Sequence, residues 1–382
     1  MLALLLVAGL ASSSPALVPE LDKPLIAGID DIYRMRFDDA EAEARRAIAV
    51  DPADPHAYLG LAGVAWTRYV YETDQGDDRW IDEYEKRTAK AVEVGEKWLK
   101  LHPKDAQGMM TLGAAYGLSS RLQIIRHHWL KGYWQGRTAL QLTTAAVKTD
   151  PQLWDAYLGL GMYDYYSDLY PRFIGVLAKI VLRGNRQRGI DYLKLVAEKG
   201  HYSRSNAKIL LVEIYTEDPY GAKNPERAVE LMQDLRREYP DSALMHSAQL
   251  VSLFSARRFE DVVKGAREYV ELSKKGRYNA IEQGKGNVIL GCGLWGLKRY
   301  DEALAAFREA QKVPFNGKMS RWAVWASIKA GNLEDMLGRR ADALNDYNLA
   351  LAQTDRWGFY ALAKPFVSKP YVAGLPDDIP PP

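Results

Sequence analysis

Residues 40–52 read AEAEARRAIAVDP, and this arrangement of small residues with a closing proline returns along the chain. Ala40, Ala44 and Ala47 stand four and three residues apart, and Pro52 follows five residues later. Positions at these spacings share one face of a helix, so the alanines form a narrow contact stripe. Proline cannot continue the helix and ends it. A recurring unit of this kind predicts a stack of helix pairs.

The further copies of the pattern contain Ala139, Thr143, Ala146 and Pro151; Ala228, Met232, Leu235 and Pro240; Ala303, Phe307, Ala310 and Pro314; and Ala343, Tyr347 and Ala350. A large residue followed by glycine, as in Leu112-Gly113, recurs upstream of them. Together these positions resemble the two helices of the tetratricopeptide repeat. The resemblance extends over residues 24–355 and implies an all-α fold, an α-solenoid of about eight helix-turn-helix units. It also implies a scaffold that binds a partner protein or peptide in the solenoid groove.

The spacing of the units changes along the chain. The second helices are expected to start at Ala40, Ala91, Ala139, Ile190, Ala228, Val262, Ala303 and Ala343. Successive starts are 51, 48 and 51 residues apart in the N-terminal half, then 38, 34, 41 and 40. The surplus predicts inserts in units two to four, near residues 68–87, 118–136 and 166–187. Insertions in repeat arrays gather on one face, which is often the binding face.

Composition excludes several classes of function. The 382 residues include 51 basic and 49 acidic side chains, and this balance gives no case for nucleic-acid binding. Cys292 is the single cysteine, so a disulfide within the chain and a cysteine-based metal site are excluded. The sequence holds no phosphate-binding loop, G-x-S-x-G or H-E-x-x-H motif. His127 and His128 are adjacent, point about 100° apart on a helix, and do not form a metal motif. We therefore expect no catalytic residues, cofactor or metal.

Both ends of the chain differ from the repeats. Residues 1–16 combine the apolar run Leu2–Leu10 with small residues after it, which is typical of a signal peptide. This predicts an exported protein that is periplasmic or envelope-associated. Residues 356–382 alternate aromatic residues with prolines, and we expect a segment that caps the last helix pair, followed by a disordered proline-rich tail.

The candidate partner-binding residues lie in and beside the second and third inserts, where basic and aromatic side chains gather. Aromatic residues with polar tips are enriched at recognition surfaces, but they also fill ordinary helix contacts. The candidates are Arg126, Trp129, Lys131, Tyr133, Trp134, Arg137, Tyr165, Tyr166, Tyr170, Arg172, Phe173 and Arg183.

Charge and hydropathy in the inserts leave two alternatives open. The first insert is acidic and the other two are basic, so the basic pair either attracts an anionic partner or is neutralised by its acidic neighbour. Residues 171–184, PRFIGVLAKIVLRG, are typical of a short amphipathic helix that lies at an anionic membrane surface or packs over the array. We expect a non-enzymatic protein–protein interaction scaffold of the cell envelope. The alternative is an envelope module that contacts anionic lipid or polysaccharide through these inserts.

Overall fold

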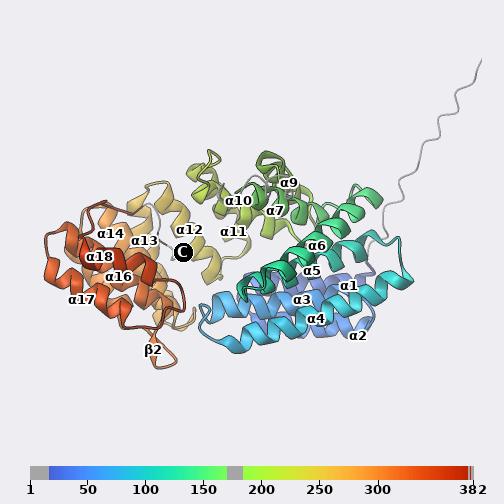
Figure 1. The fold of residues 1–382 in the computed structure, drawn as a ribbon, viewed down its shortest axis with the longest axis horizontal. Coiled ribbons are helices and arrows are strands. Elements are labelled where there is room, and N and C mark those ends of the chain that lie inside the picture. Colours follow the sequence, from blue (N-terminus) through green and yellow to red (C-terminus); the bar gives the residue numbers. More distant parts are fainter. Residues whose placement is uncertain (1–16, 170–183, 377–378, 380–382) are drawn as a thin grey trace, which may run out of the picture. The chain divides into compact units, whose positions relative to one another are not determined.

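The computed structural model describes residues 17–169, 184–376 and 379. The predicted signal peptide, residues 1–16, lies outside them. The first helices of the pairs are α1 (Pro19–Tyr33), α3 (His56–Thr67), α5 (Ala106–Ile125), α7 (Ala156–Leu169), α10 (Arg204–Glu217), α12 (Ala243–Ser255), α14 (Glu282–Gly296) and α16 (Arg321–Met336). The second helices are α2 (Phe37–Val50), α4 (Asp78–Leu101), α6 (Trp129–Thr149), α9 (Arg186–Lys199), α11 (Pro225–Glu238), α13 (Phe259–Lys274), α15 (Tyr300–Gln311) and α17 (Arg340–Leu351). The prediction of an all-α solenoid of about eight helix pairs is confirmed (Figure 1).

Three smaller elements accompany the pairs. A π-helical turn, η1 (Arg68–Glu72), follows α3, and α18 (Tyr360–Ser368) packs on α17. A two-stranded hairpin, β1 (Pro314–Phe315) with β2 (Lys318–Met319), interrupts the helices between α15 and α16. Asn316 and Gly317 have φ angles of 50° and 73° in its turn, the left-handed region that asparagine and glycine tolerate best. Pro314, a closing proline of the repeat pattern, therefore starts a strand.

The chain forms two compact units, which are described separately. Unit 1 holds the described residues of 1–32, 36–67 and 79–211. Unit 2 holds residues 33–35 and 68–78 and the described residues of 212–382.

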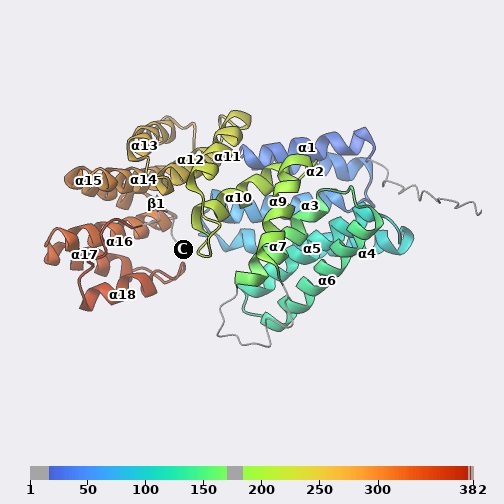
Figure 2. The same ribbon diagram turned by 90° about the horizontal axis from the view of Figure 1, so that it is seen from above.

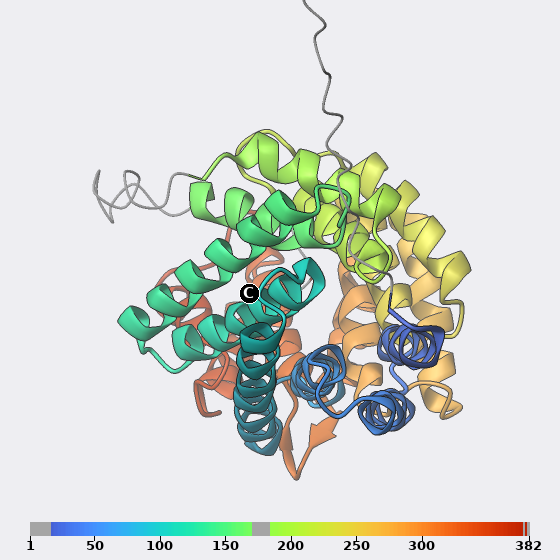
Figure 3. The ribbon, with the colours of Figure 1, turned by 90° about the vertical axis from the view of Figure 1, so that its right-hand side faces the viewer.

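Small residues set the packing distance in unit 1. Ala40, Ala44 and Ala47 are buried on one face of α2. A methyl group on Gly113 of α5 would lie 2.8 Å from the hydroxyl oxygen of Thr143 on α6, so only glycine allows this approach. Figure 3 shows the blue N-terminal helices nearly end-on, with α2 and α3 side by side.

The surplus residues of the second predicted insert form no separate element. They lengthen α5 and α6, which run side by side as a long antiparallel pair joined by residues 126–128 (Figure 1). The first predicted insert divides differently. Residues 68–77 form η1 and a loop, and residues 78–87 form the first turns of α4.

Unit 1 also contains a contact between segments far apart in sequence. Asp22 on α1 pairs with His201 at 3.0 Å and accepts a hydrogen bond from the hydroxyl of Tyr202. Asp155 accepts hydrogen bonds from the backbone N–H groups of residues 201–203, directly before α10. Packing in this unit therefore extends beyond adjacent helix pairs.

The core of unit 2 is formed by the more regular repeats. Phe307 on α15 lies against Gly291 on α14, and Tyr347 on α17 lies against Gly331 on α16. Residues 322–334 of α16 are buried on every side of the helix. A helix of this kind needs neighbours all round it, and α15 and α17 both pack on it (Figure 2).

A segment outside the repeats packs against α16 in unit 2. The buried carboxylate of Asp74, from the loop after η1, accepts a hydrogen bond from the indole of Trp322 at 3.3 Å. Lys285 and Glu282 form a buried ion pair at 2.7 Å on α14, and Glu282 also accepts a hydrogen bond from the Tyr269 hydroxyl. Asp74, which belongs to the first predicted insert, is therefore buried in the core of unit 2.

Candidate partner-binding surface

The turn between α5 and α6 is held by hydrogen bonds at both helix ends. His127 takes a φ of 59°, and the N–H of His128 donates to the carbonyl of Gln123 at 2.7 Å. The Ser120 hydroxyl donates to the carbonyl of Gly132 at 2.7 Å. A methyl group on Gly132 would lie 3.0 Å from the Ile124 side chain, so the two helices touch closely here. The side chains around the turn are therefore presented from a well-packed support.

Large apolar side chains are exposed around this turn. Ile124 and Ile125 end α5 with exposed fractions of 37% and 39%. Trp129, Leu130 and Trp134 begin α6 and are 62%, 71% and 55% exposed. We call these five residues the α5–α6 tip. Contiguous exposed apolar residues mark interaction sites, and tryptophan is the residue most enriched among energetically dominant contacts.

Basic and aromatic groups surround the tip. The guanidinium of Arg137 lies 5.7 Å from the centre of the Trp134 ring, within the range of a cation–π interaction. The ring of Tyr133 contacts that of Trp134 edge to face at 5.4 Å between centroids. Lys131 is exposed. The structure thus gathers Trp129, Lys131, Tyr133, Trp134 and Arg137, all predicted from sequence, at one end of the α5–α6 pair.

Arg126 differs from the other basic candidates because acidic residues bind it. Its guanidinium lies 2.9 Å from Asp82 and 2.8 Å from Glu85, both on α4. These carboxylates come from the acidic first insert. For this arginine, the alternative in which the acidic insert neutralises its basic neighbours is the one observed.

Tyr165 was predicted as a partner contact, and its position corrects this prediction. It is 3% exposed, and its backbone N lies 2.7 Å from where a methyl group on Gly189 would be. Tyr165 therefore packs in the contact of α7 with α9, and an aromatic pattern alone does not distinguish such a residue from an exposed one. Tyr166 is half-buried and contacts Tyr165 edge to face at 5.1 Å. The candidates Tyr170, Arg172, Phe173 and Arg183 lie outside the described residues.

Asp164 is a structural residue that sequence reasoning missed. It is 3% exposed and binds the guanidinium of Arg188 at 2.5 and 2.8 Å. The backbone N–H of Asn185 also donates to it at 3.3 Å. Asp164 therefore anchors the start of α9 on α7. In the sequence, the one sign of this role is that Asp164 stands among apolar and aromatic residues.

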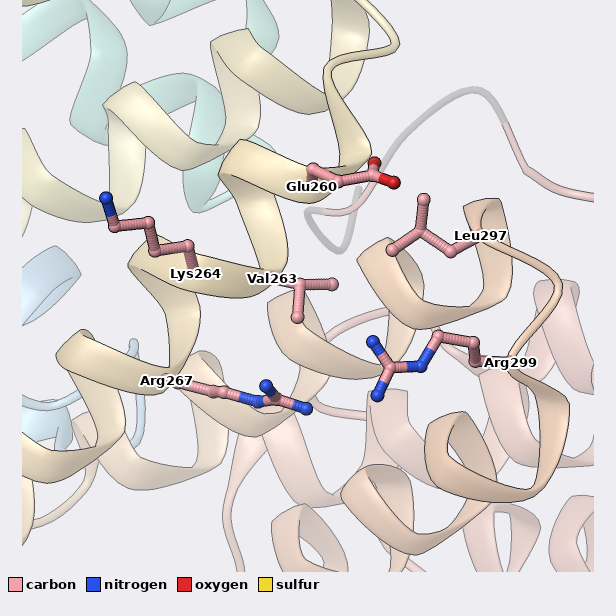
Figure 4. Close-up of a pocket in the computed structure, with 6 residues that line it drawn as sticks. All are labelled: Glu260, Val263, Lys264, Arg267, Leu297 and Arg299. Carbon is pink, nitrogen blue, oxygen red and sulfur yellow. The ribbon is translucent and has the colours of Figure 1, made fainter.

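Unit 2 has a surface hollow of about 440 Å³ between α13 and the turn before α15. Its lining residues are Glu260, Val263, Lys264, Arg267, Leu297 and Arg299 (Figure 4). The guanidinium groups of Arg267 and Arg299 point toward one another in this view. Glu302 pairs with them at 3.6 and 2.6 Å and offsets their charge. The hydrogen bond from Arg299 is the main cause that lowers the pKa of Glu302.

The described residues also bear on metal sites and membrane spans. No three histidine, cysteine, aspartate or glutamate side chains gather there in an arrangement that would hold a metal ion. Within the same residues, no helix combines the length and the apolar character needed to cross a membrane.

Comparison with known families and structures places the fold. Residues 27–106 match the family model described as tetratricopeptide repeat. The crystal structure of the APC/C hetero-tetramer Cut9–Hcn1 contains a chain that superimposes with a TM-score of 0.53 at 14% identity. That match covers 90% of this chain and 55% of the other, so this chain spans about half the length of the matched chain.

Further solved structures are similar at lower scores. Yeast Tom70 gives a TM-score of 0.41 at 12% identity, and the match covers 88% of this chain and 86% of that one. A thermophilic TPR protein of Thermus thermophilus gives 0.37 at 19% identity, over 61% of this chain and 98% of that one. A search of curated proteins gave no match.

Proposed function

Because this chain is built from tetratricopeptide repeats, we propose that it is a non-enzymatic scaffold of the cell envelope that binds another protein through the α5–α6 tip. Repeat arrays present extended surfaces, and they bind partners through side chains held in place by neighbouring helices. The groove placement expected from the sequence remains a prediction. The tip is a more specific candidate because its residues are exposed and lie together.

The exposure of the tip is the observation that carries this proposal. Trp129 and Trp134 expose more than half of their side chains, although tryptophan gains strongly from burial. The guanidinium of Arg137 lies 5.7 Å from the centre of the Trp134 ring and places a positive charge beside it. A partner that covers both rings would bury a large apolar area and place an acidic group near Lys131 and Arg137.

The test is loss of partner binding from a variant of the tip. A chain carrying Trp129→Ser, Leu130→Ser and Trp134→Ser should keep its helical content, because these side chains are exposed. Partners captured from the envelope fraction by the wild-type chain would be purified and titrated against both proteins. We expect the triple variant to raise the dissociation constant at least about thirtyfold, since truncation of a dominant contact costs ~2 kcal/mol or more.

The matched control is Leu101→Ser, which removes a 76% exposed leucine at the end of α4, away from the tip. This variant should bind the purified partner as the wild type does. Equal affinity of the triple variant and the wild type would contradict the proposal. The alternative ligand is tested by flotation with anionic vesicles and by retention on envelope polysaccharide. If the wild type binds either one and the triple variant does not, the ligand of the tip is lipid or polysaccharide instead of a protein.

The envelope location is part of this proposal and is supported by the sequence of residues 1–16. The expected result is a mature protein in the periplasmic fraction that starts at Leu17, as measured by N-terminal sequencing. Recovery of the chain in the cytoplasmic fraction with these residues intact would contradict export.

A further inference from the structure

Two opposite faces of α16 have different neighbours. Ser327 and Glu334 lie on the side toward α15, where they contact Gln311 at 3.1 Å and Arg308 at 2.5 Å. Trp322, Trp325 and Lys329 follow one another at helical spacing on the other side. We call these three residues the α16 stripe. Two indole rings and a lysine in one row are the composition of a recognition surface.

Chain segments outside the repeats cover the α16 stripe. The indole N–H of Trp325 donates to the carbonyl of Ile379 at 2.5 Å, and that of Trp322 donates to Asp74 at 3.3 Å. Lys329 lies 4.4 Å from the centre of the Trp325 ring and is 1% exposed. Ile379 is completely buried. Without Ile379, the indole N–H of Trp325 would lose its acceptor, while the ring would still stack on Phe359 at 5.5 Å between centroids.

The C-terminal segment, by which we mean residues 371–376 with Ile379, contacts this surface without forming a helix or strand, and it bends at residues 373 and 375. Tyr371 donates its backbone N–H to Asp335 at 2.9 Å, and its ring lies 6.5 Å from that of Trp295 on α14. Leu375 packs against the same core, and Ile379 ends the contact at Trp325. The apolar contacts thus recur every fourth residue. Two side chains of α16 bind the main chain of the segment, and Gly374, with a φ of 82°, turns the chain between the anchors and accepts a hydrogen bond from the Tyr371 hydroxyl at 2.8 Å.

We propose that Trp325 of the α16 stripe, with Asp335 and Trp295, forms a peptide-binding site that the C-terminal segment occupies in cis. The peptide class that fits is a non-helical segment with an aromatic residue, a glycine three residues later, a leucine directly after the glycine and an isoleucine four residues further on. A partner carrying such a segment gains access when it displaces the chain's own. This site lies in unit 2 and is independent of the α5–α6 tip.

The attachment of the C-terminal segment permits exchange. The two bonds from α16 to its main chain use side-chain groups, so any peptide main chain in the same place can make them. Val372, between the anchors, is 80% exposed. A tethered segment competes at a high effective concentration, so an untethered peptide binds the intact chain only weakly.

A direct test compares binding of a labelled peptide to two full-length chains. The probe is a fluorescein-labelled peptide with the sequence of residues 369–382, followed by fluorescence anisotropy. Tyr371→Ala with Ile379→Asp should release the chain's own segment and tighten the dissociation constant of the probe at least tenfold relative to wild type. Adding Trp325→Phe, which keeps a ring and removes the N–H donor, should weaken that binding again.

Val372→Asp is the matched control, because it adds the same charge at an exposed position of the segment. It should bind the probe no better than wild type. The proposal is overturned if the released chain and the wild type bind the probe equally, if neither binds it, or if Val372→Asp acts like the release variant.

A second measurement uses a chain in which the segment stays in place. A fluorophore attached through Val372→Cys reports on the segment, since Cys292 is buried and protected from labelling. Its anisotropy should fall as unlabelled peptide is added to millimolar concentration, while a peptide carrying the Tyr371→Ala and Ile379→Asp changes has no effect. A constant anisotropy shows that the C-terminal segment is a permanent part of the core and overturns the proposal, even where the release variant fails to fold.

Discussion

At Gly113 the absence of a side chain decides how closely α5 and α6 approach. A methyl group there would lie 2.8 Å from the Thr143 hydroxyl and 3.2 Å from the Ala139 carbonyl. Neither neighbour can withdraw easily, since the carbonyl is backbone and Thr143 donates a hydrogen bond to it at 2.8 Å. The glycine of the repeat pattern is therefore a packing residue.

Gly113→Leu should destabilise the protein severely, because overpacking a helix crossing costs about 1–3 kcal/mol or more. The measurement is urea denaturation followed by circular dichroism. Gly117→Ala on the same helix is the control, because a methyl group there meets nothing within 4 Å. It should stabilise by up to about 1 kcal/mol through helix propensity. If the free energy of unfolding of Gly113→Leu equals that of the wild type, Gly113 does not pack against α6 as described.

At the scale of elements, several helices begin where a polar side chain accepts their first backbone N–H groups. Asp105 caps α5, Asn224 caps α11 and Ser320 caps α16, each from the residue before the helix. The start of α10 is different. The backbone N–H groups of residues 201–203, directly before α10, donate to Asp155, which lies 46 to 48 residues earlier in the turn before α7.

Asp155→Ala should lower the free energy of unfolding by about 1–3 kcal/mol, because it leaves three N–H groups without their acceptor in a partly buried place. Asp155→Asn keeps one acceptor oxygen and should cost less. Asn224→Ala, a loss of an ordinary cap, should cost about 1 kcal/mol. Urea denaturation of the three variants gives the order, and an Asp155→Ala variant as stable as wild type would contradict the role.

At the scale of the whole chain, segments far apart in sequence complete unit 2. Arg356 donates to the carbonyl of Gln75 at 2.6 Å, and the indole of Trp357 donates to the carbonyl of Asp74 at 3.0 Å. These contacts join positions that are 281 and 283 residues apart. The segment that contains Asp74 is thereby held against unit 2. Asp74 is buried there beside charged residues, and burial raises its pKa to about 6.

The buried carboxyl of Asp74 makes the stability of unit 2 depend on pH. Desolvation is the largest cause of its raised pKa; Glu282 raises the pKa further, and Lys285 and Arg321 lower it, so the folded state prefers the protonated acid. Its contribution to stability is therefore fully present below the ordinary aspartate pKa of 3.8 and is lost as pH rises through about 6. Asp74→Asn removes this titration. Relative to wild type, the variant should gain up to about 3 kcal/mol between pH 4 and pH 7.5.

Urea denaturation at several pH values, followed by tryptophan fluorescence, measures this difference. Asp301→Asn is the control, because the Asp301 side chain is 86% exposed in the same unit. Its difference from wild type should stay nearly constant over the range. A constant difference for Asp74→Asn would show that Asp74 is not buried in solution.

The helix pairs and their order were predictable from the sequence because their causes are local. Small residues at three- and four-residue spacing mark a contact face wherever they occur, and proline ends a helix whatever surrounds it. The expected second helices accordingly contain Ala44, Phe307 and Tyr347 at their buried centres. The aromatic cluster at Trp129 and Trp134 was likewise visible as composition.

Only the tertiary structure decided which aromatic residues are exposed and what covers the repeats. Tyr165 and Trp134 lie in similar aromatic sequence, yet one is 3% and the other 55% exposed. Residues 68–78 and the C-terminal segment have no repeat period, and they meet α14 and α16 through contacts between positions distant along the chain. Helical periodicity is a property of residues that are close in sequence, so it predicts the helices and their pairing with the next helix along the chain. Long-range contacts depend on where the folded pairs bring separate segments together, and no local pattern records this.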